Sequence, residues 1–376
     1  MNIVVLRETQ KGEARVALMP ESVKKFTDLK VTVLVESGAG LGAARTDDDY
    51  KEAGAQISTD RDALLSQANV LAAVNRPSPE DLDRLNSGSV VIGFLRPLDE
   101  PAALVPAVNR GLTTFAVELI PRITRAQAMD ALSSMATVAG YKAVLVGASY
   151  IPRMFPLLMT AAGTVPPARV LVLGAGVAGL QAIATARRLG AVVEGYDVRA
   201  AAGEQVKSLG AKFLEVDLGG IKTEDAGGYA VELSDEAMNR GRALIAEHAK
   251  ATDVLITTAQ VPGRRAPLLI TEEAVNGMKR GSVIIDLAGA TGGNCALSKA
   301  DEVVERNGVT ILSPTNLPGT VPVHASQLYS RNLTTFLSPI IKDGQLHIDM
   351  NDDVVGPSCV THKGEIVNKR VASLIS

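Results

Sequence analysis

Three glycines and an aspartate have the spacing of a dinucleotide-binding turn. Gly174, Gly176 and Gly179 follow the apolar residues 170–173, and Asp197 ends a second apolar run 18 residues after Gly179. The first glycine lets the chain turn off a strand, the second leaves room for a pyrophosphate, and the third lets a helix approach the sheet. The phosphates would bind backbone N–H groups at the positive end of that helix.

The acid at position 197 bears on the choice of cofactor. A carboxylate there accepts hydrogen bonds from the adenosine ribose hydroxyls and repels a 2′-phosphate, which favours NAD(H) over NADP(H). Arg199 complicates this choice, because an arginine near the acid can serve a 2′-phosphate. A tight strand-to-helix turn without a ligand is the alternative, but it gives no packing reason for Asp197. We therefore predict an NAD(H) site.

A polar segment before this turn offers a second set of groups. Arg122, Gln127, Asp130 and Ser133 provide a cation, an amide, a carboxylate and a hydroxyl, which could hold a carboxamide and a ribose or phosphate. The segment could equally be a solvated loop in which Ser133 is the N-cap of the next helix. The loop at 227–229 could be a mobile lid or an ordinary surface loop.

No acid–base or metal chemistry stands out elsewhere. The chain has four histidines, and we expect His248 to be solvated, His324 to be structural, and His347 and His362 to lie in a polar tail. Its two cysteines have neither disulfide nor metal-ligand spacing, and no carboxylate cluster suits a metal. We predict no metal site and no histidine general base.

Bulk properties exclude several classes of protein. A net charge of −3 without a basic block argues against a nucleic-acid ligand. No apolar run reaches the roughly 18 residues that a membrane span needs, and the N-terminus resembles a first strand more than a cleavable signal. We expect a soluble, cytoplasmic protein with no direct membrane insertion.

Apolar strands alternate with helices along the chain of 376 residues, which is long enough for two domains. This pattern predicts an α/β protein with two Rossmann-like, doubly wound parallel-sheet domains separated by a cleft. The expected N-terminal domain is discontinuous, 1–133 plus 327–376, and the NAD(H)-binding domain is 134–326. A helix at 134–148 would carry the chain across, and a helix at 327–337 would lead it back.

Four segments together resemble the NAD(H)-binding component (domain I) of proton-translocating transhydrogenases, and the resemblance runs along essentially the whole chain. The most specific stretches are residues 121–134, 159–186, 226–230 and 286–294. The chain departs from the usual pattern of that family at Ala290, where an acid is common, and at Arg96.

The resemblance implies roles for individual residues. Arg122, Gln127, Asp130 and Ser133 would clamp the nicotinamide half of NAD(H) and aim it for direct hydride transfer to NADP+. Tyr229 would ride on a mobile loop that closes over the adenosine half. The further cofactor contacts implied are Val177, Val198, Arg199, Gly228, Ala259 and Gln260.

The resemblance also implies partners. The expected assembly is a homodimer that docks on membrane-spanning transhydrogenase subunits and on an NADP(H)-binding component. The protein would then be peripheral to the inner membrane through those partners.

Alanine dehydrogenase is the related alternative. That enzyme binds pyruvate with an arginine and a lysine, and has a histidine and an aspartate near the reacting carbon. Arg15 matches the arginine, but Asn75, Arg96 and Ala290 stand at the other three positions. Amine oxidation requires proton transfers, whereas hydride transfer between two nicotinamide rings does not. A non-catalytic NAD(H)-binding subunit is a third possibility.

Overall fold

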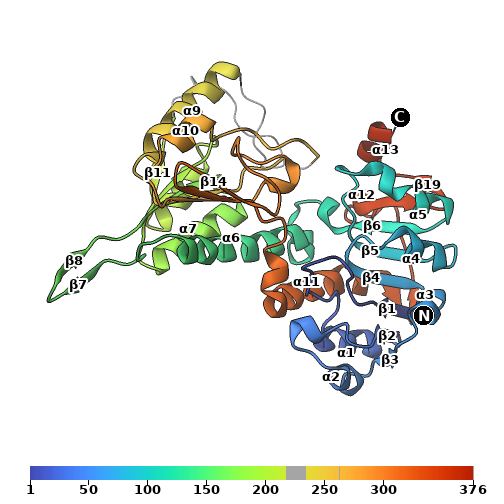
Figure 1. Ribbon diagram of the computed structural model, residues 1–376. Helices are drawn as coiled ribbons and strands as arrows, with labels where there is room; N and C mark the ends of the chain where they lie inside the picture. Colours follow the sequence, from blue (N-terminus) through green and yellow to red (C-terminus); the bar gives the residue numbers. More distant parts are fainter. Residues whose placement is uncertain (217–233, 262, 376) are drawn as a thin grey trace. The chain divides into compact units, whose positions relative to one another are not determined.

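The computed structural model describes residues 1–216, 234–261 and 263–375. The chain forms two compact units, and the first is discontinuous in sequence (Figure 1). Unit 1 contains Met1–Met135 and Pro318–Ser376, and unit 2 contains Ala136–Leu317.

Unit 1 is built on an eight-stranded sheet in the order β19-β18-β6-β5-β4-β1-β2-β3. Its strands are β1 (Asn2–Val5), β2 (Thr32–Glu36), β3 (Gln56–Ser58), β4 (Val70–Asn75), β5 (Val90–Phe94), β6 (Thr113–Ala116), β18 (Cys359–His362) and β19 (Glu365–Ile366). Strands β1 to β6 are parallel, and β1 pairs with both β2 and β4. The chain therefore winds outward in two directions from β1, as predicted for a doubly wound sheet.

Helices cover both faces of this sheet. They are α1 (Pro20–Asp28), α2 (Asp47–Glu52), α3 (Arg61–Ser66), α4 (Pro79–Arg84), α5 (Val105–Asn109), α11 (Pro322–Leu337), α12 (Val355–Ser358) and α13 (Lys369–Ile375). One face buries Val4, Leu71 and Val91 against leucines of α3 and α4. On the other face, α11 places Tyr329 on Phe94, with ring centroids 5.5 Å apart. The helix expected at 327–337 thus begins one turn earlier, with Pro322 in its first turn.

The C-terminal segment completes the sheet of unit 1. Strand β18 pairs antiparallel with β6, and β19 pairs antiparallel with β18. His362, expected in a polar tail, lies within β18, where its Nδ1 is 3.0 Å from Thr113 Oγ1. The sequence pattern did not indicate these strands, because they are short and the sheet edge that they cover is distant in sequence.

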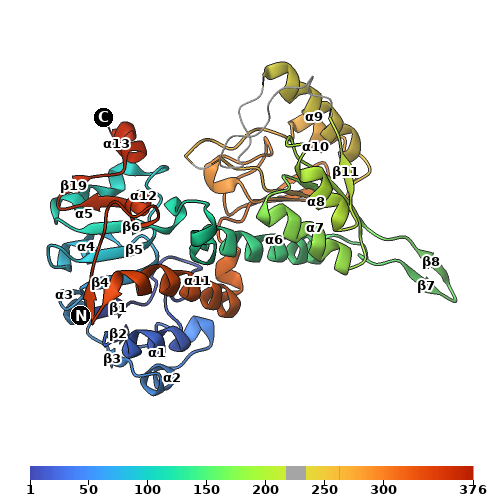
Figure 2. The ribbon, with the colours of Figure 1, turned by 180° about the vertical axis from the view of Figure 1, so that it is seen from behind.

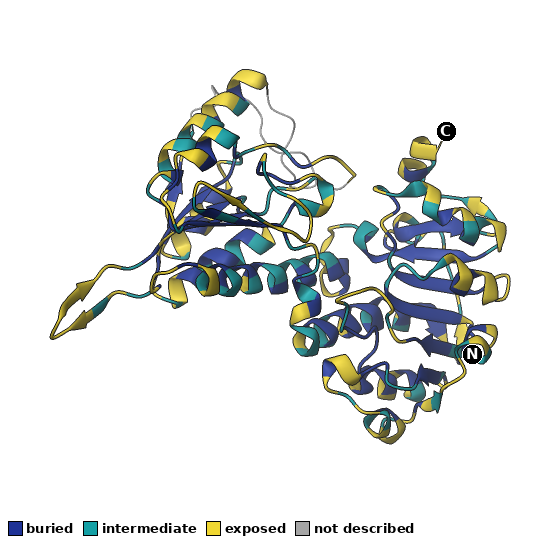
Figure 3. Ribbon diagram, in the orientation of Figure 1, coloured by how far each residue is buried: buried dark blue, intermediate teal, exposed yellow. Residues whose placement is uncertain are grey.

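Unit 2 has a seven-stranded sheet in the order β11-β10-β9-β12-β13-β15-β14. Its strands are β9 (Arg169–Leu173), β10 (Val192–Tyr196), β11 (Lys212–Leu214), β12 (Val254–Thr257), β13 (Val283–Asp286), β14 (Val303–Arg306) and β15 (Val309–Leu312). All pairs are parallel except that of β14 with β15. The sequence pattern did not predict β14. From β9 the sheet continues through β10 and β11 on one side, and through β12, β13, β15 and β14 on the other. Figure 3 shows both sheets as the buried layers of their units.

Alternate residues of β9 supply two cores. Val170 and Val172 pack with α7 (Val177–Arg188), α8 (Ala202–Ser208) and α6 (Ala131–Tyr150). Leu171 and Leu173 pack on the opposite face with α9 (Asp235–Ala249) and α10 (Glu272–Asn276). This continuous apolar strand with helices on both faces is the pattern of a buried parallel sheet.

Helix α6 differs from its prediction at both ends. It was expected at 134–148 with Ser133 as a possible N-cap. Instead the Asp130 carboxylate accepts the Ser133 N–H at 2.8 Å, so Asp130 caps the helix and the alternative of Ser133 as the N-cap is wrong.

Helix α6 is also, among the described residues, the one helix long and apolar enough to cross a membrane by length and composition alone. The prediction of no membrane span rested only on uninterrupted apolar runs. Lys142 and several small polar residues interrupt the apolar run of α6. From Ala136 onward, however, one face of the helix packs against unit 2, and 39% of its apolar stretch is buried. Ala143 and Val144 are fully buried, and a methyl group on Gly140 would collide with the Ala178 carbonyl of α7.

A β-hairpin leaves the sheet of unit 2 just before β9 (Figures 1 and 2). It consists of β7 (Leu158–Thr160) and β8 (Gly163–Val165), which pair antiparallel. The sequence pattern did not predict it. Two of its apolar side chains, Met159 and Val165, are 79% and 39% exposed.

Candidate nucleotide-binding site

The three glycines form a turn between β9 and α7. Gly174 has a φ of 95°, in the left-handed region, and a side chain there would meet Thr258 Oγ1 at 2.6 Å. A Cβ on Gly179 would collide with the Gly174 carbonyl, so this glycine permits close contact between helix and turn. These two requirements agree with the physical roles that the spacing predicted.

Gly176 is different, because it faces open space. It has ordinary extended backbone as the N-cap of α7, and apart from its chain neighbours no described atom lies within 4 Å of the Cβ that it lacks. Val177, the first residue of the helix, is 39% exposed beside it. The residues therefore fit a pyrophosphate, which would occupy the open side of Gly176 at the positive end of a 12-residue helix.

Asp197 lies at the carboxyl end of β10 and is held in place by the turn. Its Oδ2 accepts the Ala175 N–H at 2.7 Å, and its Oδ1 accepts the Arg199 N–H at 2.9 Å. The Arg199 side chain forms a fork on the same carboxylate, with Nε 2.9 Å from Oδ1 and Nη2 2.9 Å from Oδ2. Arg199 is therefore an ion-pair partner of Asp197, and ribose hydroxyls would share the carboxylate with it.

A third segment borders the turn. Thr258, directly after β12, donates its hydroxyl to the Gly174 carbonyl at 3.0 Å. Gln260 is exposed and donates to the Leu287 carbonyl at 2.8 Å, and Ala259 between them is half-buried. Thr258 was not among the predicted residues, although a polar residue directly after a buried strand is a usable signal.

The polar segment lies in unit 1. Arg122 and Gln127 are exposed, and Gln127 belongs to a 3₁₀ helix, η4 (Thr124–Met129). Asp130 and Ser133 are bound to each other, since the Ser133 hydroxyl donates to the Asp130 carboxylate at 2.6 Å. The structure thus brings these two together, and Asn332 of α11 supports the turn by donating to the Ala128 carbonyl at 2.9 Å.

Other predicted positions have mixed outcomes. Gly228 and Tyr229 lie outside the described residues, and Val198 is half-buried next to Asp197. His248, expected to be solvated, is instead bound to a sheet residue: its Nδ1 is 2.8 Å from Glu194 Oε2. Among the described residues, no group of three or more His, Cys, Asp or Glu could hold a metal ion.

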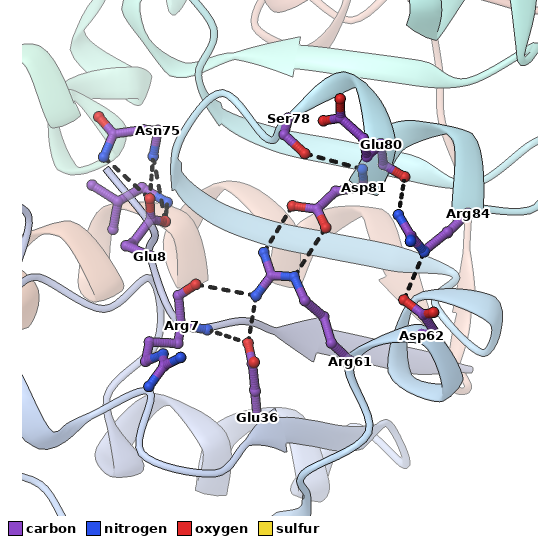
Figure 4. A network of polar contacts seen from close by, with 11 residues as sticks. Arg7, Glu8, Glu36, Arg61, Asp62, Asn75, Ser78, Glu80, Asp81 and Arg84 are labelled. Carbon is purple, nitrogen blue, oxygen red and sulfur yellow. Dashed lines mark hydrogen bonds and ion pairs between the residues drawn. The ribbon is translucent and has the colours of Figure 1, made fainter. Parts of the chain in front are cut away.

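The corresponding edge of unit 1 is filled by ion pairs (Figure 4). Glu36 ends β2 much as Asp197 follows β10, and it accepts the Arg7 N–H at 2.8 Å. The Arg61 guanidinium, however, lies between Glu36 and Asp81, at 2.6 Å and 2.7 Å. Residues 6–19, between β1 and α1, contain a single glycine. This edge therefore lacks the features that suit a dinucleotide in unit 2.

The Arg15 environment bears on the alternative enzyme. Arg15 is buried, and its guanidinium contacts the Glu13 carboxylate at 2.5 Å and 2.8 Å. Asn75 donates to both Glu13 and Glu8, at 3.0 Å and 3.1 Å. The pKa of Glu8 is raised by burial, although hydrogen bonds from Val74 and Asn75 oppose the rise. The cation that matches a substrate-binding arginine thus already has a carboxylate partner.

Fold and turn together define a dinucleotide-binding α/β protein. Models of the alanine dehydrogenase/PNT N-terminal and C-terminal domains match residues 4–139 and 143–369. An alpha-subunit chain of the NAD(P) transhydrogenase of Rhodospirillum rubrum is 49% identical over 98% of each chain. A transhydrogenase structure from Sinorhizobium meliloti superimposes with a TM-score of 0.88 at 46% identity, covering 98% of this chain and all of that one.

An L-alanine dehydrogenase structure has the same fold at greater distance, with a TM-score of 0.84 and 27% identity over 100% of this chain and 99% of that chain. The chain belongs to the alanine dehydrogenase/PNT family, and within it to the NAD(P) transhydrogenase alpha subunits. This confirms the predicted family, fold class and NAD(H) cofactor.

Proposed function

We propose that this protein is the NAD(H)-binding component of a proton-translocating, Re/Si-specific NAD(P) transhydrogenase. The observation that carries the proposal is the turn of unit 2, with open space at Gly176 and a carboxylate at Asp197. When bound, NADH supplies a hydride from its nicotinamide C4 to NADP+ on a partner component, which yields NAD+ and NADPH. The contribution of this chain is to bind, to orient and to exclude water.

Each group of residues has a role in this proposal. The N–H groups at the start of α7 hold the pyrophosphate, and Asp197 holds the adenosine ribose. Arg122, Gln127, Asp130 and Ser133 orient the nicotinamide. Gly228 and Tyr229 contribute to the adenosine half.

The Arg15–Glu13 ion pair favours this function over an alanine dehydrogenase. A substrate carboxylate would have to share Arg15 with the negatively charged Glu13, and it would find Asn75 where that enzyme has a lysine.

The partners are inferred on separate grounds. The exposed apolar side chains of the β7–β8 hairpin support a homodimer, because soluble monomers seldom expose such residues in a cluster. The NADP(H)-binding component and membrane-spanning subunits would place the protein on the cytoplasmic side of the inner membrane. The names of the relatives as alpha subunits support this assembly.

One reconstitution tests the function. The purified protein is mixed with an NADP(H)-binding transhydrogenase component, and NADPH formation from NADH and NADP+ is followed. Hydride transfer supports the proposal. Binding of NADH without transfer would identify a non-catalytic subunit, and pyruvate formation from L-alanine and NAD+ would identify an amino-acid dehydrogenase.

A further inference from the structure

Asn294 is fully buried in unit 2 and binds the backbone of the segment that contains Ala259. Its Nδ2 donates to the carbonyls of Ala259 and Pro267 at 2.9 Å and 2.8 Å, and its Oδ1 accepts the Ala259 N–H at 3.2 Å. Its own carbonyl accepts the N–H groups of Leu269 and Ile270, at 2.8 Å and 2.9 Å. One residue thus fixes both ends of this segment.

Asn294 is itself held by a buried carboxylate at the end of β13. Asp286 accepts the backbone N–H groups of Asn294 and Cys295 at 2.8 Å and 3.0 Å, and the hydroxyl of Ser298 at 2.6 Å. Its other oxygen accepts the Thr257 hydroxyl at 2.8 Å. A fully buried carboxylate needs such donors, and here they make the connection between β13, Asn294 and Ala259 rigid.

The position of this connection in the sheet identifies the half of the cofactor that it faces. A doubly wound sheet binds one mononucleotide on each side of its switch point, which in unit 2 lies between β9 and β12. Asp197 follows β10, on the adenosine side. Ala259 follows β12 and Asp286 ends β13, both on the other side, which therefore receives the nicotinamide nucleotide.

We propose that Asn294 is a positioning residue for the nicotinamide half of the NAD(H) site, acting through the backbone of Ala259. This inference rests on the proposed NAD(H) function. Asn294 occupies both polar backbone groups of Ala259, so Ala259 would present its methyl group to the cofactor, beside Gln260. Gln260 is in turn tied to the Leu287 carbonyl, one residue from Asp286. Release of Ala259 would therefore move the wall of the nicotinamide half and leave the Asp197 side in place.

The decisive experiment compares two ligands on one variant of the full chain. Asn294→Asp keeps the size of the side chain and the oxygen that accepts the Ala259 N–H. It replaces the donating amide nitrogen by an oxygen, which then faces the carbonyls of Ala259 and Pro267. We expect the Kd of NADH to rise about 10-fold, which corresponds to the net contribution of about one hydrogen bond. The Kd of ADP, which occupies only the adenosine half, should change less than about twofold. Both are measured by titration calorimetry.

Ser282→Ala is the matched control. It removes a buried hydrogen bond of unit 2, which the Ser282 hydroxyl donates to the Thr252 carbonyl at 2.9 Å, at the opposite end of β13 from Asp286. NADH and ADP should both bind this control as they bind the wild type. This should hold even where its melting temperature falls as much as that of Asn294→Asp. If Asn294→Asp does not fold, Asn294→Ala removes the same contacts without bringing charge beside Asp286, and the same split is expected.

Equal loss of NADH and ADP affinity, or no loss of either, would overturn the role of Asn294. Failure of the proposed function has a different result: the wild type would not bind NADH, or would bind it and transfer no hydride in the reconstitution. The two failures are therefore distinguishable.

Discussion

The Arg199 guanidinium donates to both oxygens of the Asp197 carboxylate beside the glycine turn. Its Nε is 2.9 Å from Oδ1 and its Nη2 is 2.9 Å from Oδ2. The side chains are 20% and 6% exposed, so the pair is largely shielded from solvent. The acid that favours NAD(H) and the cation that could favour NADP(H) thus neutralise each other. We therefore predict that the balance between these two charges sets the preference for NADH or NADPH.

Asp197→Asn should therefore narrow the preference for NADH. The variant loses the charge that repels a 2′-phosphate and leaves Arg199 available to bind one. We expect NADH to bind about 10-fold more weakly, since hydrogen bonds to a charged group contribute about 1.5–3 kcal/mol, and NADPH to bind more tightly. Fluorescence titrations with both nucleotides measure this. Glu215→Gln, on an exposed residue, is the control, and an unchanged preference in Asp197→Asn would contradict the role of the acid.

Two neighbouring glycines should respond in opposite ways. Gly176→Val introduces a side chain into open space, so the fold should keep its melting temperature while NADH binding falls at least about 10-fold. Gly179→Ala should instead destabilise unit 2 by about 1–3 kcal/mol, because its methyl group meets the Gly174 carbonyl. Thermal unfolding and NADH titration of both variants separate the effects. Tight NADH binding by Gly176→Val would show that the pyrophosphate does not bind beside Gly176.

Gln127→Ala should slow hydride transfer more than it weakens NADH binding. Gln127 is exposed on η4, so its truncation should cost little stability, while the proposed orienting contact would be lost. Single-turnover transfer to NADP+ on the partner component, beside an NADH titration, gives both quantities. Gln67→Ala, at the end of α3, is the matched control. A normal transfer rate in Gln127→Ala would show that this side chain does not orient the nicotinamide.

Glu118 should make unit 1 less stable as the pH rises. Burial raises the pKa of this carboxyl group to about 7, although hydrogen bonds from the backbone of Arg96 and neighbours oppose the rise. Its Oε2 is buried and has no hydrogen-bond partner among the described residues, while the residue as a whole keeps some exposed surface. The folded protein therefore binds the proton more tightly than the unfolded chain does.

The sign follows from that difference. Stability is fully present below pH 4.5 and is lost as the pH rises to about 7, by about 1–3 kcal/mol. Glu118→Gln should remove this part of the pH dependence and be the more stable protein at pH 8. Urea unfolding at pH 5 and pH 8 measures it, with Glu365→Gln on an exposed strand as the control. The same slope in wild type and Glu118→Gln would assign the effect to another group.

The hairpin variant Met159→Asp should dissociate the proposed homodimer. Met159 is 79% exposed, so a charge there costs the folded monomer little but would be buried unpaired in a dimer interface. Light scattering after size exclusion measures the mass. Leu41→Asp, at an exposed position of unit 1, should leave the mass unchanged. A dimer that survives Met159→Asp would place the interface elsewhere.

The sequence predicted the nucleotide turn well because the relevant requirements are local. A left-handed φ at Gly174 and the contact of Gly179 with the Gly174 carbonyl arise within six residues of chain, so spacing alone reveals them. The same is true of the continuous apolar run of β9. The short strands β14, β18 and β19 escaped prediction because their pairing partners supply most of their stability.

The sequence by itself determined the family, the two doubly wound sheets, the glycine turn and its acid, since each depends on residue type at short spacing. Tertiary structure alone decided how the acids are paired. Asn75 with Glu8 and Glu13, Arg61 with Glu36 and Asp81, and Asn294 with Asp286 and Ala259 are contacts between side chains and loop ends whose meeting depends on strand order. A buried charge must be satisfied by whichever donors the fold brings to it, and the linear pattern does not name those donors.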